Sequence, residues 1–191
     1  MSPILGIWAS SAQAAANAGS FESIATVTVG AGGSSTITFS SIPQTYTHLQ
    51  VRAIARATDS GTDSIGSLLQ LNGNTGNNYA YHLIEGTGSS VVAAGVPNIN
   101  YVDVIERPRA GTTANTFGPM ILDILDYTNT NKYKTVRSLS GFDSNGAGKV
   151  DFFSGFYFLN TNAITQIDIT GGGGTFAQYS HFALYGIKTT V

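Results

Sequence analysis

The sequence contains no cysteine, which excludes disulfide bonds and cysteine-ligated metal centres. It is also poor in charge, because only 10% of its 191 residues are charged, against about 25% in an average globular protein. The formal net charge is −2, so there is no basic footprint for nucleic acid and we expect no nucleic-acid partner. No apolar run approaches the ~20 residues of a membrane-spanning helix, so we expect no membrane span.

Apolar side chains are plentiful in spite of this low charge. Hydrophobic residues make up 42% of the chain and include 10 phenylalanines and 9 tyrosines, a composition that disordered chains do not have. Solubility must then rest on neutral polar residues. Such a composition is typical of a β-rich protein with many turns. It also suits a surface that packs against neighbours, because low charge density lowers the electrostatic barrier to assembly.

Residues 1–20 carry no charged side chain and include Trp8, the only tryptophan. The stretch Ala12-Gln13-Ala14 matches a signal-peptide cleavage pattern, but no lysine or arginine precedes it and its apolar core is short and interrupted. We therefore interpret residues 1–20 as a retained N-terminal anchoring arm that is buried against another chain. Its four large apolar side chains are the candidate assembly anchors: Ile4, Leu5, Ile7 and Trp8.

Residues 21–191 are predicted to form one β domain. Apolar and polar residues alternate with a period of two in short runs, and turn signals separate the runs every 8 to 12 residues or so. The run 120–127 is apolar on both faces, which predicts a central strand. The segment 91–97 is ambiguous, and no long amphipathic helix is visible. We expect an all-β fold, an antiparallel β-sandwich of the jelly-roll type whose last strand returns beside an early one. The expected strands are 24–29, 36–42, 46–56, 67–71, 79–84, 101–105, 120–127, 132–142, 150–159, 163–170 and 180–188.

The sequence contains no convincing catalytic, cofactor or metal motif. His48, His82 and His181 stand at no metal-ligand spacing from one another, and no GxSxG marks a nucleophile. Gly146–Lys149 lacks the first glycine and the hydroxyl residue of a phosphate-binding loop. Asp59–Asp63 has two carboxylates that suit calcium, but a turn explains them better. We expect a protein that is not an enzyme, with no cofactor and no metal.

Three loops combine amides with aromatic rings, as sugar-binding surfaces do: 72–81, 129–133 and 178–181. Ordinary β turns have the same composition, so the interpretation stays open. The candidate glycan contacts are Asn74, Asn77, Tyr79, Tyr133 and Tyr179.

Both ends of the chain resemble the structural proteins of tailed bacteriophages. The resemblance lies in SPILGIWASS (2–11) running into FESIATVTVG (21–30), in ITFSSIPQTYTHLQVRAIAR (37–56) and in FALYGIK (182–188). Residues 59–180 contribute little to it. The resemblance provides no catalytic motif to carry over.

This resemblance implies a virion protein, of the tail-fibre, baseplate or head-decoration type, that assembles as a homotrimer. Its arm would attach to other virion proteins and its sandwich would project outward, where it could contact a host surface glycan. The alternatives are a head-decoration (cement) protein whose arm staples capsid subunits, a secreted carbohydrate-binding module, and a hydrolase.

Overall fold

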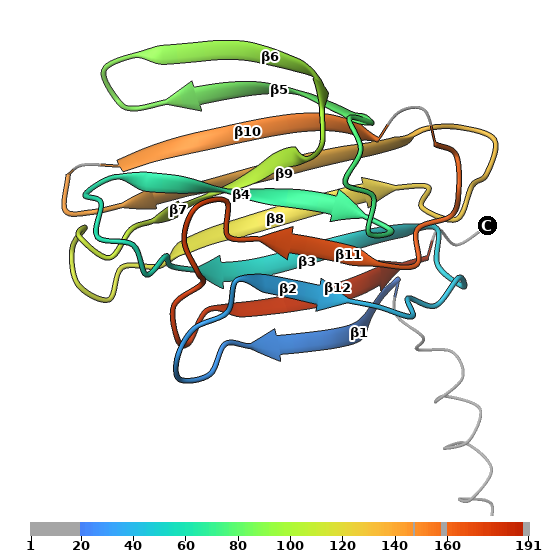
Figure 1. The fold of residues 1–191 in the computed structure, drawn as a ribbon, viewed down its shortest axis with the longest axis horizontal. Coiled ribbons are helices and arrows are strands. Elements are labelled where there is room, and N and C mark those ends of the chain that lie inside the picture. The colour runs from blue at the N-terminus through green and yellow to red at the C-terminus, as the bar shows by residue number, and fades with distance from the viewer. Residues whose placement is uncertain (1–19, 147, 158–159, 189–191) are drawn as a thin grey trace, which may run out of the picture.

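Twelve strands build the part of the chain that the computed structural model describes, residues 20–146, 148–157 and 160–188, and this part contains no helix (Figure 1). Among these residues, accordingly, no helix long and apolar enough to cross a membrane is found. The strands are β1 (Phe21–Thr28), β2 (Thr36–Phe39), β3 (His48–Ala55), β4 (Ser64–Leu71), β5 (Tyr79–Gly86), β6 (Val91–Ile99), β7 (Val102–Pro108), β8 (Gly118–Leu125), β9 (Lys134–Asp143), β10 (Gly148–Tyr157), β11 (Ile167–Thr170) and β12 (His181–Ile187).

The strands form two antiparallel sheets that pack as a sandwich. The larger sheet has eight strands in the order β1-β12-β3-β8-β9-β10-β5-β6, and the smaller has four in the order β2-β11-β4-β7. The predicted all-β sandwich is therefore confirmed. The last strand, β12, lies between β1 and β3, so it returns beside early strands as expected. β8 is the fourth of eight strands, so the central position predicted for it is also confirmed.

Asparagine–glycine pairs make two of the tight turns. Asn72 and Gly73 follow β4 with φ angles of 54° and 63°, and Asn145 and Gly146 join β9 to β10 with φ angles of 60° and 99°. Positive φ is unstrained for glycine and tolerated by asparagine, so Asn145–Gly146 can reverse the chain between the paired strands β9 and β10, and Asn72–Gly73 can turn it at the end of β4.

The core lies between the sheets and follows from the alternation of side chains along each strand. On β8, Met120, Leu122 and Ile124 face inward and are at most 2% exposed. Because successive residues of a strand point to opposite faces, Ile121 and Asp123 lie on the outer face of the large sheet.

Three cationic side chains are buried among the described residues, and each bonds to main-chain carbonyls: Arg56, Arg107 and Lys134. Lys134 Nζ donates to the carbonyl of Thr161 at 2.9 Å, and Arg56 Nη1 donates to that of Thr116 at 2.7 Å. Loop carbonyls without a strand partner need a donor when they are buried. These cations supply it and so hold the loops at both ends of the sandwich.

The segment 91–97, which the sequence left ambiguous, belongs to β6. This strand is the outer edge of the large sheet, and most of its residues are exposed. Its sequence, VVAAGVPNI, has no charged side chain to discourage pairing with another strand.

Candidate functional site

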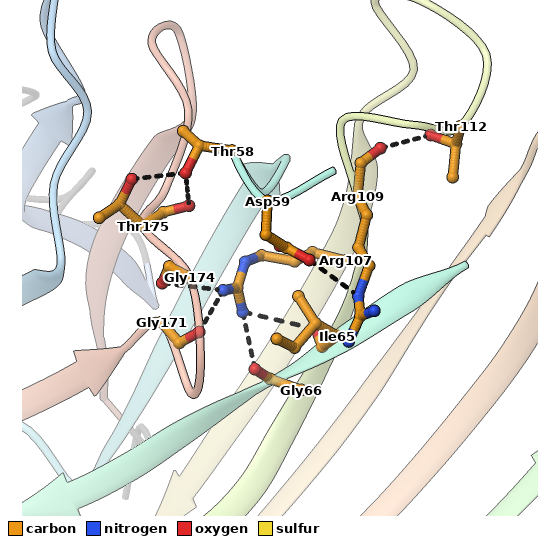
Figure 2. A network of polar contacts seen from close by, with 10 residues as sticks. All are labelled: Thr58, Asp59, Ile65, Gly66, Arg107, Arg109, Thr112, Gly171, Gly174 and Thr175. Atoms are coloured by element: carbon orange, nitrogen blue, oxygen red, sulfur yellow. Dashed lines mark hydrogen bonds and ion pairs between the residues drawn. The ribbon is translucent and has the colours of Figure 1, made fainter. Parts of the chain in front are cut away.

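Arg107 is the centre of the polar network in Figure 2. Its side chain is fully buried, and its guanidinium donates to the carbonyl of Gly66 at 2.8 Å, to Ser67 Oγ and to the carbonyl of Gly171. The guanidinium carbon also lies 4.7 Å from the ring centroid of Phe176. Burial lowers the pKa of Arg107 to about 10.

The remaining contacts of this network join three segments of the chain. Arg109 Nε lies 3.1 Å from Asp59 Oδ2, and the hydroxyls of Thr58 and Thr175 are 2.8 Å apart (Figure 2). The loop after β3, the end of β7 and the glycine loop 171–174 are thereby tied together. Because Arg107 bonds to acceptors of its own chain, we interpret this network as structural.

A second cluster of charged side chains surrounds Lys149. Its Nζ lies 2.9 Å from Glu85 Oε2 and 3.3 Å from Glu106 Oε2. Burial raises the pKa of Asp103 to about 7, and repulsion by Glu106 adds to this shift. Burial also raises the pKa of Asp151 to about 7, although the attraction of Lys149 opposes it.

Carboxyl groups that titrate near neutral pH are common in acid–base sites, so this cluster is a candidate for one. Asp151, however, is 1% exposed, and neither it nor Asp103 lines the groove described next, whereas Lys149 does. The carboxyl groups are therefore not placed to meet a molecule bound in that groove. We interpret the cluster as buried charge that joins β5, β7 and β10.

A groove of about 730 Å³ opens on the large sheet at the end where β9 turns into β10. This volume lies within the range of about 300–1,000 Å³ that ligand pockets have. The turn between β5 and β6 and the start of β8 form its other walls. The lining is largely apolar and includes Pro119, Ile121, Leu139, Phe142 and Val150.

Strand register places four exposed apolar side chains in one row beside this groove. Ile121 on β8 pairs with Leu139 on β9, Leu139 pairs with Phe152 on β10, and Phe152 pairs with Ile84 on β5. Directly paired residues point to the same face of a sheet. Leu139 is 50% exposed and Ile84 is 54% exposed. Single exposed apolar residues are ordinary, but a contiguous set marks an interaction surface.

A smaller hollow of about 250 Å³ adjoins the groove and shares Ile121 and Leu139 with it. On its far side Asp123 and Arg137 form an ion pair, with 3.3 Å between Oδ2 and Nη2. A polar row thus bounds the apolar surface. We call the following five residues the apolar face: Ile84, Ile121, Leu139, Val150 and Phe152.

The prediction that Tyr79 contacts a glycan is wrong, because its side chain is fully buried. Its ring stacks on Tyr157 with 4.8 Å between centroids, and its hydroxyl accepts a hydrogen bond from the Leu71 amide at 2.9 Å. Tyr79 starts β5 on the inward side, where burial raises its pKa. Asn74 is half-buried and donates to the Tyr157 hydroxyl at 2.8 Å.

The other predicted glycan contacts are exposed but do not form one site. Asn77 and Tyr133 lie in the β4–β5 and β8–β9 connections, at one end of the large sheet. Tyr179, which is 71% exposed, precedes β12 at the other end. The candidate anchors Ile4, Leu5, Ile7 and Trp8 lie outside the described residues.

Within the described ranges, no group of three or more histidine, aspartate or glutamate side chains is arranged to hold a metal ion. The fold and the apolar face define a two-sheet antiparallel β-sandwich with an uncovered outer sheet surface. No family model, curated protein or solved structure matches the chain.

Sequence reasoning missed the apolar face. The available signal was the run 150–159, VDFFSGFYFL. Both sets of alternating positions in this run contain large apolar residues, so both faces of the strand are apolar in the sequence. Alternation alone does not say which side faces the core, and here Asp151 faces inward while Val150 and Phe152 face outward.

Proposed function

We propose that the protein is a structural, non-enzymatic subunit of a bacteriophage virion, of the tail-fibre or baseplate-peripheral type. The observation that supports this proposal most is the apolar face, which is exposed although the sandwich already has a complete hydrophobic core between its sheets. Such a surface favours association, because water contact with it is removed only when another molecule covers it. The resemblance of both chain ends to tailed-phage structural proteins is what points the proposal toward a virion.

The composition supports the same proposal. With 10% charged residues, the protein has little charge to keep copies apart, and several charges are buried inside. The uncharged residues 1–20 would add a second apolar element for attachment to other virion proteins. Contact with a host surface glycan stays a prediction for the exposed residues Asn77, Tyr133 and Tyr179.

Particles of the phage that encodes the chain provide the test. Mass spectrometry of purified particles should detect the protein, and gold-labelled antibody against it should mark the tail. Labelling over the head would instead assign it as a decoration subunit. Absence of the protein from purified particles refutes the proposed function.

A further inference from the structure

The groove and the point where residues 1–19 join the domain lie at opposite ends of the strands. Phe21 at the start of β1 pairs with Ile187 at the end of β12. The groove lies at the other end, between the β5–β6 and β9–β10 turns. In Figure 1 these turns are on the left, whereas β1 starts and β12 ends on the right.

The chain itself contains a segment that suits the groove chemically. Residues 4–8, ILGIW, are apolar, and residues 1–20 have no charged side chain that would be desolvated on binding. The groove presents an apolar lining in which Lys149 and Asp143 are the charged members. A binding site of this kind discriminates against charged segments, because an unpaired charge loses its hydration there.

The connecting residues are long enough to cross to a groove. Residues 9–20 span up to about 40 Å when extended, at about 3.3–3.6 Å per residue. Four strand spacings, or about 19 Å, separate β1 from β9 across the sheet. Along the strands, Ala183 of β12 lies at the level of the groove, and the offset from Ile187 to Ala183 is about 14 Å. The arm can therefore span the distance of about 24 Å with length to spare.

The arm has two grooves to bind, that of its own copy and that of another copy. The polar row of the outer face favours binding to another copy. A straight path from the start of β1 to the same copy's groove runs over Gln50 on β3 and beside Asp123 on β8, which share a hydrogen bond of 2.8 Å. An uncharged segment that covers these polar groups removes their hydration and provides no charged partner to compensate for it. An arm that leaves one end of a subunit meets the groove at the opposite end of the next subunit without this crossing.

We propose that residues Ile4–Trp8 of one copy bind the groove and apolar face of a second copy. Such a head-to-tail contact is heterologous, and it closes into a ring when the rotation between copies allows it. The assignment deepens the proposed function and rests on it for the setting in which the contact is used.

Trp8 reports on this contact in the full-length protein, because the chain has no other tryptophan. We expect Trp8 emission to be blue-shifted and protected from iodide quenching at high protein concentration, and to become exposed on dilution as the oligomer dissociates. Leu139→Glu and Val150→Glu, both on the apolar face, should weaken self-association by about tenfold or more and expose Trp8. Tyr133→Glu is the matched control, because Tyr133 is 52% exposed at the opposite end of the sheet.

A complementation experiment then assigns donor and acceptor. The arm variant Leu5→Glu/Ile7→Glu and the groove variant Leu139→Glu should each be monomeric alone. When they are mixed, the intact arm of one should bind the intact groove of the other and form a heterodimer. Circular dichroism and urea unfolding of each variant verify that it is folded.

Three results overturn the proposal: Trp8 exposed in the wild type at all concentrations, Trp8 protected in a monomer, or Trp8 protection unchanged by both groove variants. Its failure is separable from that of the proposed function. The protein can be present in purified particles while Trp8 ignores the groove, or absent from particles while the arm–groove contact persists in solution.

Discussion

Replacing Asp103 with asparagine should make the protein more stable at pH 8 and flatten the pH dependence of its stability. Burial raises the pKa of this carboxyl from 3.8 to about 7, so the folded protein holds a proton that the unfolded chain has released. A raised pKa contributes stability that is complete below the unfolded pKa of 3.8. That contribution is lost as the pH rises from there through 7.

The magnitude follows from the size of the shift. A difference of about 3 pKa units corresponds to about 4 kcal/mol between acid pH and pH 8. Asp103 Oδ1 is buried, but the residue as a whole is half-buried, so solvent screens part of this energy. Burying the asparagine amide also has a cost. We therefore expect the advantage of the variant to grow by about 1–3 kcal/mol between pH 5 and pH 8.

Urea unfolding at pH 5, 6, 7 and 8 measures this difference directly. Asp63→Asn, at an exposed position before β4, makes the same chemical change on the surface and serves as the control. A difference between Asp103→Asn and wild type that stays constant across this range refutes the argument. So does a difference that falls as the pH rises.

Two further substitutions test the packing of the sandwich. Arg107→Met should lower the free energy of unfolding by about 1–3 kcal/mol for each buried carbonyl, of Gly66 and of Gly171, that loses its donor. Arg137→Met, whose side chain is 55% exposed, should change it little. Tyr79→Phe keeps the stacked ring but removes the hydroxyl that bonds to Leu71, so urea unfolding should show a loss of about 1 kcal/mol; an unchanged stability would contradict the role assigned to that hydroxyl.

The sandwich could be predicted from the sequence because its signals are local. Apolar residues on both faces of 120–127 indicated a central strand, and β8 has a partner strand on each side. The asparagine–glycine pairs at 72–73 and 145–146 take positive φ angles, so the same residues that signal a turn also shape it. These features depend on a few adjacent residues and need no knowledge of the rest of the chain.

β6 could not be assigned with the same certainty. Gly95 and Pro97 weaken a strand pattern, and the segment lacks polar alternation. Both residues are tolerated because β6 is an edge strand with one hydrogen-bonding partner, β5. Whether a strand lies at an edge depends on the whole sheet, which residues 91–99 do not encode locally.

The burial of Tyr79 was missed for a related reason. Tyr79 and Tyr133 both sit beside polar loops in the sequence, yet one packs inward on Tyr157 and the other is half exposed. Loop composition predicts that a turn is present, but the direction of the first strand residue decides whether its ring is buried. That direction depends on how the two sheets pack.

The apolar face and the buried charges have one explanation in common. Arg56, Arg107 and Lys134 face inward, where each donates to a carbonyl of a connecting loop: those of Thr116, Gly171 and Thr161. A chain with nine cationic residues that places three of them inside has few left for its surface. Outer positions of β8, β9 and β10 carry exposed apolar side chains such as Ile121 and Leu139. The low charge of the sequence is therefore consistent with two features of the fold. Buried cations hold the loops at the ends of the sandwich, and the outer face of the large sheet carries an apolar surface suited to contact with another chain.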